Sequence, residues 1–340
     1  MLIFGHLGTR SYTKTIMSLT SILKSPHHKE LKAKIREYFP KPSFNLSGEV
    51  KVPSTTGVPS EIGTAFDYLI RFYIERNNPH IVVQKDMLVA EAGLELIENM
   101  EARSKEMGGY SSYNAKVLRE WFKFGKKSYK GYLETGKVNA GLFLTAILFA
   151  KLDVPFRAGV DPNFNDLTNK GLVKIRIKEL SALFRLLDSE IFHAEKRVLL
   201  NPTFGIASNM VGGADADFII DGTLVDIKTV KELKLKLSDC DQLAGYYLLS
   251  RIGGLDGNLD AEPIDRLGIY FSRFGQLWTI SIEEFMLPIG NGLIELKKMW
   301  TDHEASQEEI DIETKTLREK VATRAMECQN WVRTYFDQGP

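Results

Sequence analysis

Hydrophobic positions recur at helical spacing through much of the first 190 residues. Apolar side chains at positions 62, 66, 69, 70 and 73, for example, would all lie on one face of a helix. The same pattern predicts helices over 28–38, 61–75, 86–107, 113–134, 138–152 and 177–191. Proline and glycine interrupt the chain before position 60, so they separate the first helix from the others.

Between positions 196 and 282 the pattern becomes that of strands. Short apolar runs alternate there with glycine and Asp-Gly, which is typical of strands joined by turns. These runs predict strands over 197–200, 216–220, 223–228, 267–271 and 277–282, with one helix over 238–250. A charged amphipathic helix over 308–335 follows. The expected fold class is therefore α/β, with a core of strands wrapped by helices.

Asp221-Gly222 lies between two apolar strands and predicts a two-residue hairpin turn. Both central residues of such a turn need a positive φ, which these residue types tolerate. The resulting register places Asp217 opposite Asp226 and Asp215 opposite Lys228. Because side chains alternate across a strand, all four of these polar residues would project from one face.

Three carboxylates on one sheet face destabilise the hairpin unless their charge is compensated. A hard divalent cation with oxygen ligands removes this penalty, and Mg²⁺ binds to few carboxylates together with water and phosphate. A lysine beside the cation could orient the water that attacks a phosphodiester. A hairpin with a solvated acidic face is the alternative, and geometry alone does not separate the two. The apolar residues that flank the acidic positions favour a site.

The residues after the hairpin strengthen this interpretation. Gln242 and Tyr246 lie one helical turn apart on the same face of the next predicted helix. Asp217, Asp226-Ile-Lys228 and Gln242-x-x-x-Tyr246 together resemble the motifs of the PD-(D/E)XK nuclease superfamily. The trailing Gln-x-x-x-Tyr most resembles the RecB-type and CRISPR-adaptation exonuclease branch. The strict resemblance covers about 190–285, and the rest is matched only in outline.

The resemblance implies a restriction-endonuclease-like mixed β-sheet flanked by helices, with a large helical insertion. It divides the chain into an N-terminal helical and loop extension, 1–59, and a nuclease domain, 60–300. Within that domain the insertion would occupy about 80–190 and the catalytic sheet about 195–285. Residues 301–340 would form a C-terminal helix.

The resemblance and the hairpin geometry together assign the metal ligands. Asp217 and Asp226 would bind Mg²⁺ or Mn²⁺, with the backbone carbonyl of Ile227 as a further ligand. Asp215 competes with Asp217 for this role. Spacing favours Asp217, because it is the cross-strand partner of Asp226.

The remaining catalytic roles fall on the lysine and the following helix. Lys228 would orient the attacking water and stabilise the charge of the transition state. Gln242 and Tyr246 would hold this lysine or the phosphate of the scissile strand.

The family also uses an acidic residue on a helix before the sheet. Segment 60–71 is similar to its Gly-x-x-x-[His/Glu] helix, with Asp67 at the acidic position. Asp67 would be a metal ligand or would support one, and Glu61 is the reserve. A surface aspartate on an amphipathic helix is the alternative.

Composition limits the class of protein. The chain has 44 basic and 44 acidic residues, so indiscriminate coating of nucleic acid is not expected. Its two cysteines cannot form a disulfide framework, a four-thiolate zinc site or an iron–sulfur cluster, and the cysteines of cluster-bearing relatives are absent. The sequence shows neither a secretory leader nor a membrane-spanning run, so a cytoplasmic location and no membrane partner are expected.

A basic segment at 116–137 is the candidate nucleic-acid surface. Its lysines include Lys123, Lys126, Lys127 and Lys130, and aromatic residues are interleaved with them. Basic side chains neutralise phosphates and aromatic rings stack on unpaired bases. The alternative is an ordinary helix with buried rings and solvated lysines. Arg273, after the fourth strand, is a second candidate phosphate contact, with turn capping as its alternative.

The expected function is metal-dependent hydrolysis of DNA, in repair and recombination or in defence against phage and plasmids. No nucleotide-binding loop is present, so helicase or ATPase activity would come from a partner. Two alternatives stay open: a binding or structural subunit with little activity, and a nuclease that cleaves RNA. Endonuclease, nickase and exonuclease activities also stay open, as does the oligomeric state.

Overall fold

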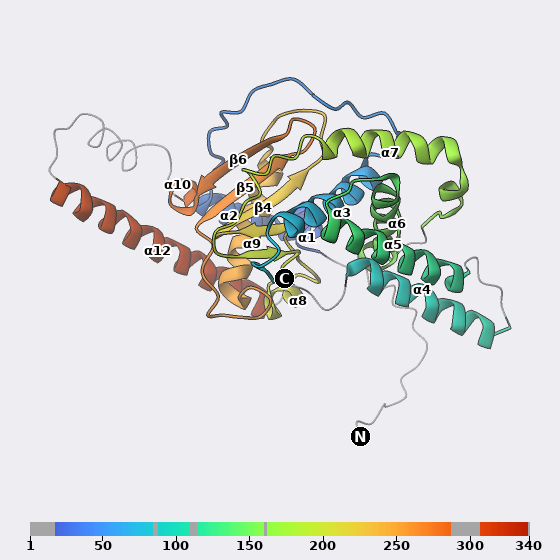
Figure 1. Ribbon diagram of the computed structural model, residues 1–340. Coiled ribbons are helices and arrows are strands. Elements are labelled where there is room, and N and C mark those ends of the chain that lie inside the picture. The colour runs from blue at the N-terminus through green and yellow to red at the C-terminus, as the bar shows by residue number, and fades with distance from the viewer. Residues whose placement is uncertain (1–17, 84–87, 109–113, 160–161, 287–306, 339–340) are drawn as a thin grey trace.

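A mixed sheet with helices on both faces forms the body of the protein (Figure 1). We describe it from a computed structural model, in which residues 18–83, 88–108, 114–159, 162–286 and 307–338 are described. The expected α/β class is confirmed. The first residues, which bear on a secretory leader, lie outside this range. Within it, no helix is both long and apolar enough to cross a bilayer.

The sheet has the order β1-β2-β3-β4-β5-β6. Its strands are β1 (Val82–Val83), β2 (Val198–Leu200), β3 (Phe218–Ile220), β4 (Thr223–Lys228), β5 (Arg266–Phe271) and β6 (Gln276–Ser281). The β1/β2 and β4/β5 pairs are parallel and the others are antiparallel. All five predicted strands are present, and the two-residue β1 was not predicted.

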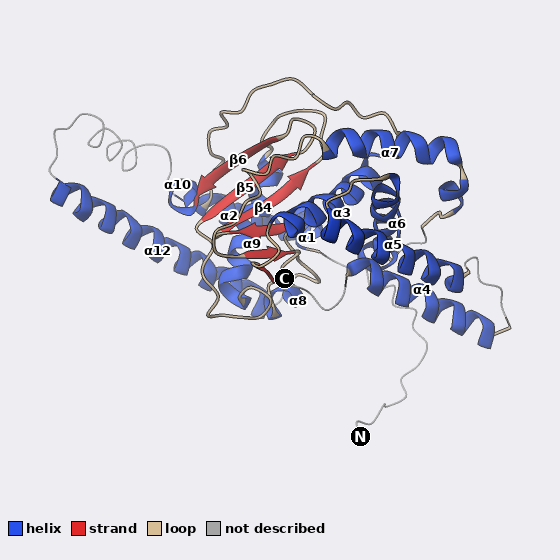
Figure 2. Cartoon of the chain, viewed as in Figure 1, coloured by secondary structure: helices blue, strands red, loops and turns tan. Residues whose placement is uncertain are grey.

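Helices pack around the strands of the sheet (Figure 2). Alternating side chains of the strands enter two separate cores. Leu224 and Ile269 face the first core, whereas Val225 and Tyr270 face the second. The first core is covered by α1 (Leu19–Lys24), α2 (Lys29–Tyr38), α8 (Ile206–Met210), α9 (Leu237–Gly253), α10 (Ile282–Met286) and α12 (Gln307–Asp337). The second is covered by α3 (Pro59–Asn77), α4 (Val89–Glu106), α5 (Ala115–Thr135), α6 (Ala140–Ala158) and α7 (Lys170–Phe184).

Helix α6 is the centre of the second helical layer. It is apolar around most of its circumference and packs against α3, α4, α5 and α7, as expected for a buried helix. At Gly93 of α4, a Cβ would lie 1.7 Å from the carbonyl oxygen of Leu152, so only glycine permits this close approach.

The largest differences from the predicted helix boundaries are in α6 and α7. Helix α6 continues through Pro155 to Ala158 and ends at Gly159, which has a left-handed conformation. Helix α7 covers Lys170–Phe184 rather than 177–191, because the Asn169 side chain accepts hydrogen bonds from two amides of its first turn.

Candidate active site

The β3–β4 hairpin has the predicted turn and the predicted first three pairs. Asp221 and Gly222 have φ values of 45° and 84°. Phe218 pairs with Val225 and Ile220 with Thr223. The Asp-Gly signal therefore fixed the register of the strands that carry Asp226 and Lys228.

The chain leaves this ladder at Asp217, one residue before β3. Continuation of the hairpin would pair the Ile227 amide with the Ala216 carbonyl. The Ile227 amide donates instead to Asp217 Oδ2, at 2.5 Å, while the Ala216 amide donates to the Pro202 carbonyl. The carboxylate of Asp217 thus replaces a backbone acceptor and is fixed beside β4.

Asp215 does not lie opposite Lys228, so that part of the predicted register is wrong. It forms an isolated antiparallel bridge with Thr203, because the chain before β3 follows the segment after β2. Its carboxylate accepts two hydrogen bonds from Arg157, from Nη1 at 2.9 Å and from Nη2 at 2.7 Å. Asp215 is therefore committed to an ion pair, and Asp217 remains the carboxylate nearest β4.

Asp226, Lys228, Gln242 and Tyr246 form one connected chain of polar contacts. The Lys228 ammonium lies 2.7 Å from Asp226 Oδ2 and donates to Gln242 Oε1 at 2.9 Å. Gln242 Nε2 in turn donates to the Tyr246 hydroxyl at 2.8 Å. Strand β4 supplies the first two residues and helix α9 the other two, so the four motif positions meet in space.

Asp67 reaches the same region from α3. Its Oδ2 accepts a hydrogen bond from Arg71, one turn later in the helix. Its Oδ1 is buried and has no hydrogen-bond partner among the described residues. One turn earlier in α3, a Cβ on Gly63 would lie 3.8 Å from the Cβ of Thr229, the residue after β4, so this part of α3 packs beside the end of β4. The charge of Asp67 contributes to the raised pKa of Asp217.

Burial and mutual repulsion raise the pKa values of these carboxyl groups. Burial, followed by Asp67 and Asp226, raises the pKa of Asp217 well above its usual range. Burial also raises the pKa values of Asp226 and Asp67, although Lys228 and Arg71 respectively oppose the effect. Burial would lower the pKa of Lys228, but the neighbouring Asp226 outweighs it and the net shift is upward.

These residues fit a hard divalent cation in their chemistry. Within the described ranges, no three His, Cys, Asp or Glu side chains already converge as a metal site. The cluster nevertheless offers an unpartnered buried carboxylate oxygen on Asp67 and two repelling carboxyl groups. Oxygen donors of this kind suit Mg²⁺ or Mn²⁺, and a cation would relieve the repulsion.

Glu61 is excluded from the cluster by its own partners. It forms ion pairs with Lys151 at 2.7 Å and with Arg176 at 2.6 Å. Both of these cations are buried and also pair with Asp166. Glu61 therefore belongs to a network that joins α3, α6 and α7, and the prediction of it as a reserve ligand is wrong.

Arg273 is not a phosphate contact. Its side chain is 0% exposed and donates to the Val52 carbonyl at 3.0 Å and to Glu179 Oε1 at 2.6 Å. Glu179 Oε2 accepts from the amides of Thr55 and Thr56. This buried pair anchors the loop before α3, a role that is neither the predicted phosphate contact nor the turn capping given as its alternative.

The aromatic residues of the predicted basic segment differ in whether α5 buries or exposes them. Phe122 and Tyr132 are buried in the second core, whereas Trp121 and Phe124 are exposed. The last two help to line a cleft of about 210 Å³ between α5 and α6.

The lysines of α5 occupy another stretch of the helix surface. Lys123 pairs with Glu120 at 2.8 Å and Lys126 with Glu91 at 3.4 Å. A second hollow, of about 500 Å³, is lined by Lys123, Lys126, Lys127, Lys130, Gly131 and Glu134. The four predicted lysines therefore do gather on one surface, partly neutralised by glutamates.

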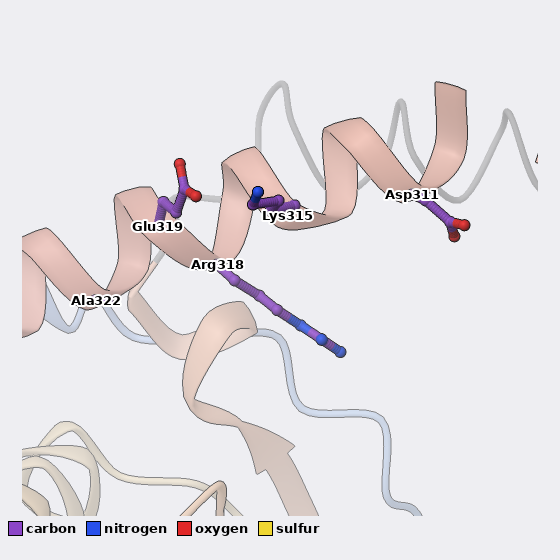
Figure 3. A pocket seen from close by; sticks show the side chains of 5 residues that line it. All are labelled: Asp311, Lys315, Arg318, Glu319 and Ala322. Atoms are coloured by element: carbon purple, nitrogen blue, oxygen red, sulfur yellow. The ribbon is translucent and has the colours of Figure 1, made fainter. Parts of the chain in front are cut away.

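A hollow along α12 includes none of the motif residues in its lining. It has a volume of about 520 Å³ and is lined by Asp311, Lys315, Arg318, Glu319 and Ala322. Figure 3 shows that these side chains leave the helix in different directions. The alternating charges do not converge on one point, so they do not form a second candidate centre.

Arg157 is the residue near the cluster that the sequence analysis missed. The prediction ended the helix at 152, ahead of Pro155, although proline is compatible with a helix whose neighbours compensate for the lost hydrogen bond. Gly159 was the available signal for the true end, because glycine favours the left-handed position after a helix.

Comparison of the chain with family models, with curated proteins and with solved structures found no match. The functional argument therefore rests on the sequence motifs and on the geometry of the cluster.

Proposed function

We propose that this protein is a metal-dependent nuclease that hydrolyses phosphodiester bonds of DNA, built on a restriction-endonuclease-like core. The observation that carries the proposal is the contact chain Asp226–Lys228–Gln242–Tyr246, with Asp217 fixed beside it by the Ile227 amide. In a hairpin with a solvated acidic face, Asp226 would be exposed, and no glutamine of another element would hold the lysine by a hydrogen bond.

Each group in the cluster has a chemical task in this proposal. Asp217, Asp226, Asp67 and the Ile227 carbonyl would hold Mg²⁺ or Mn²⁺, which supplies Lewis acidity and lowers the pKa of water. Lys228, held between Asp226 and Gln242, orients the attacking water and balances negative charge on the phosphate.

The lysine-lined surface of α5 supports nucleic acid as the polymer. Four lysines on one surface can neutralise several backbone phosphates, even though the whole chain has equal numbers of acidic and basic residues. We place the protein in the cytoplasm, in DNA repair or in defence, where a helicase or ATPase subunit would be its partner.

The test is cleavage of labelled DNA, linear and covalently closed circular, single- and double-stranded, in Mg²⁺ or Mn²⁺. We expect cleavage that disappears with EDTA and in Asp226→Ala. Asp260→Ala is the matched control, because Asp260 is an exposed loop carboxylate that is not one of the motif residues. Attack on circles identifies an endonuclease, and restriction to linear DNA identifies an exonuclease.

Two other outcomes would overturn the proposal. Cleavage of RNA but not of DNA, in a parallel reaction, would identify a metal-dependent nuclease that acts on RNA. Binding of DNA without cleavage, in both metals, would identify a nucleic-acid-binding subunit with a nuclease fold.

A further inference from the structure

Arg157 lies in the last turn of α6, beside the carboxylate cluster. Its Nε donates to Asp153 Oδ2 at 3.2 Å, and Asp153 is itself buried and bonded to the Tyr68 hydroxyl. The two terminal nitrogens face Asp215 in a bidentate pair, and Nη2 also lies 3.4 Å from Asn201 Oδ1. The guanidinium is thus held along one edge by buried groups and presents its other donors to a carboxylate.

The other cations around the cluster are less accessible. Lys228 is engaged by Asp226 and Gln242. Arg71 is 6% exposed and is bonded to Asp67. The side chain of Arg157 is 37% exposed and that of Asp215 is 24% exposed, so solvent reaches this pair. Contacts also connect Arg157 to the cluster: through Asp153 it reaches Tyr68, the residue after Asp67 on α3, and Asp215 lies two residues before Asp217.

We propose that Arg157 binds a backbone phosphate of the substrate strand next to the cluster, and that Asp215 occupies its guanidinium until the phosphate replaces it. This inference rests on the proposed function. Phosphate and carboxylate both accept two parallel hydrogen bonds from a guanidinium, so the exchange keeps the geometry of the pair. The bond to Asp153 is not involved, and it keeps the arginine in position during the exchange.

Asp215 then has a specific role that differs from metal binding. It keeps a positive charge oriented beside the buried carboxylates in the free protein, at the cost of competing with the substrate. A purely structural Arg157 would only tie the end of α6 to the Thr203–Asp215 bridge. If Arg157 binds phosphate, removal of the Asp215 charge should tighten DNA binding. If Arg157 is purely structural, the same change should weaken DNA binding or leave it unchanged.

The experiment measures binding of a fluorescein-labelled DNA oligonucleotide by anisotropy, in Ca²⁺ to prevent turnover, across a series of salt concentrations. We expect Arg157→Lys to weaken binding by about 10-fold, because a lysine cannot reproduce the bidentate pair. Arg157→Ala should weaken binding further and reduce the slope of log K against log salt by about 1. Asp215→Asn should tighten binding several-fold, since it releases the arginine.

Arg185→Ala is the matched control, because Arg185 is exposed just after α7 and its guanidinium donates to Ser181 on that helix. Thermal unfolding of every variant identifies losses that come from the fold. If Asp215→Asn weakens binding or leaves it unchanged, or if Arg157→Ala lowers only the melting temperature, the inference is overturned.

The cleavage assay separates this inference from the proposed function. Suppose that cleavage depends on metal and is lost in Asp226→Ala, but that the Arg157 variants bind DNA as the wild type does. The proposed nuclease activity would then be supported, and the proposed contact between Arg157 and phosphate would be wrong. Wild-type protein that binds DNA but never cleaves it would remove the nuclease, whatever the Arg157 series shows. Absence of DNA binding by the wild-type protein would overturn both.

Discussion

Lys228 shows how a single side chain is specified by residues on two elements. Because side chains alternate along β4, Lys228 lies on the same face as Asp226. Gln242 of α9 accepts a hydrogen bond from the Lys228 ammonium. An ammonium is a flexible point charge with three donors, so two fixed acceptors are needed to aim it. Tyr246 extends the same argument, because its hydroxyl accepts from the Gln242 amide and holds the carbonyl oxygen toward the lysine.

Replacement of Lys228 with alanine should lower the rate of DNA cleavage by at least about 100-fold, because it removes the group that orients the attacking water. Binding of Mn²⁺, measured by calorimetry, should persist, since the carboxylates remain. Lys234→Ala is the control, because it removes the same charge from an exposed position of the following loop. Cleavage by Lys228→Ala at a rate near that of the wild type would contradict the role assigned to the lysine.

At the scale of elements, the β3–β4 turn is tied to the segment before β2 by one carboxylate. Asp221 accepts hydrogen bonds from the amides of Glu195, Lys196 and Arg197, at 2.6 to 2.8 Å. Burial alone would raise the pKa of Asp221, but these three amides outweigh it and the net shift is downward. The turn therefore positions β2 as well as reversing the chain.

Asp221→Asn should reduce the free energy of unfolding by about 1.5–3 kcal/mol at pH 7, the range for hydrogen bonds to a charged group. Asparagine tolerates the positive φ, so the variant removes the charge and keeps the turn. A depressed pKa stabilises the folded state above the unfolded value of about 3.9, and this contribution is lost as pH falls through the folded value.

Urea unfolding at a series of pH values measures this effect. The difference between Asp221→Asn and the wild type should be constant near neutrality and shrink below about pH 4. Asp260→Asn should show no such difference. A gap between Asp221→Asn and the wild type that does not change with pH would contradict an effect of the Asp221 charge.

Local sequence patterns predicted most helices and strands and the strand face that carries Asp226 and Lys228. They did not predict the positions of residues whose partners are distant in the sequence. The turn at Asp221 determined the pairs nearest to it, because hairpin register is a local property. Asp215 was misplaced because the chain before Phe218 pairs with the segment after β2 instead of with β4, and this depends on a distant part of the chain. Arg273 was misassigned because its partner, Glu179, lies on a helix 94 positions away. No sequence window contains such a pair.

For the whole molecule, the candidate site depends on both helical layers at once. Asp67 comes from α3 in one layer, and Gln242 comes from α9 in the other. The sheet between them supplies Asp226. Loss of either layer would therefore separate the groups, and the opening of the α9 layer can be followed through the two cysteines.

Cys240 of α9 and Cys328 of α12 lie in the same core and are 1% and 0% exposed. Burial raises the pKa of each thiol to about 12. Ellman's reagent reacts with the thiolate, so at pH 8 each cysteine should react only when its helix opens. Cys328 should react faster, because α12 packs on α2, α9 and α10, whereas α9 is held by α1, α2, α8 and α12.

Two single-cysteine variants separate the openings, since Cys240→Ala leaves only Cys328 and Cys328→Ala leaves only Cys240. The rate for Cys328 should rise weakly with urea, as expected for detachment of one helix, whereas the rate for Cys240 should rise as steeply as global unfolding. Because Gln242 lies two residues beyond Cys240, protection of Cys240 then reports an assembled site. Equal rates and equal urea slopes for the two thiols would show that α9 and α12 open as one unit, and α12 would then be required to hold Gln242 against Lys228.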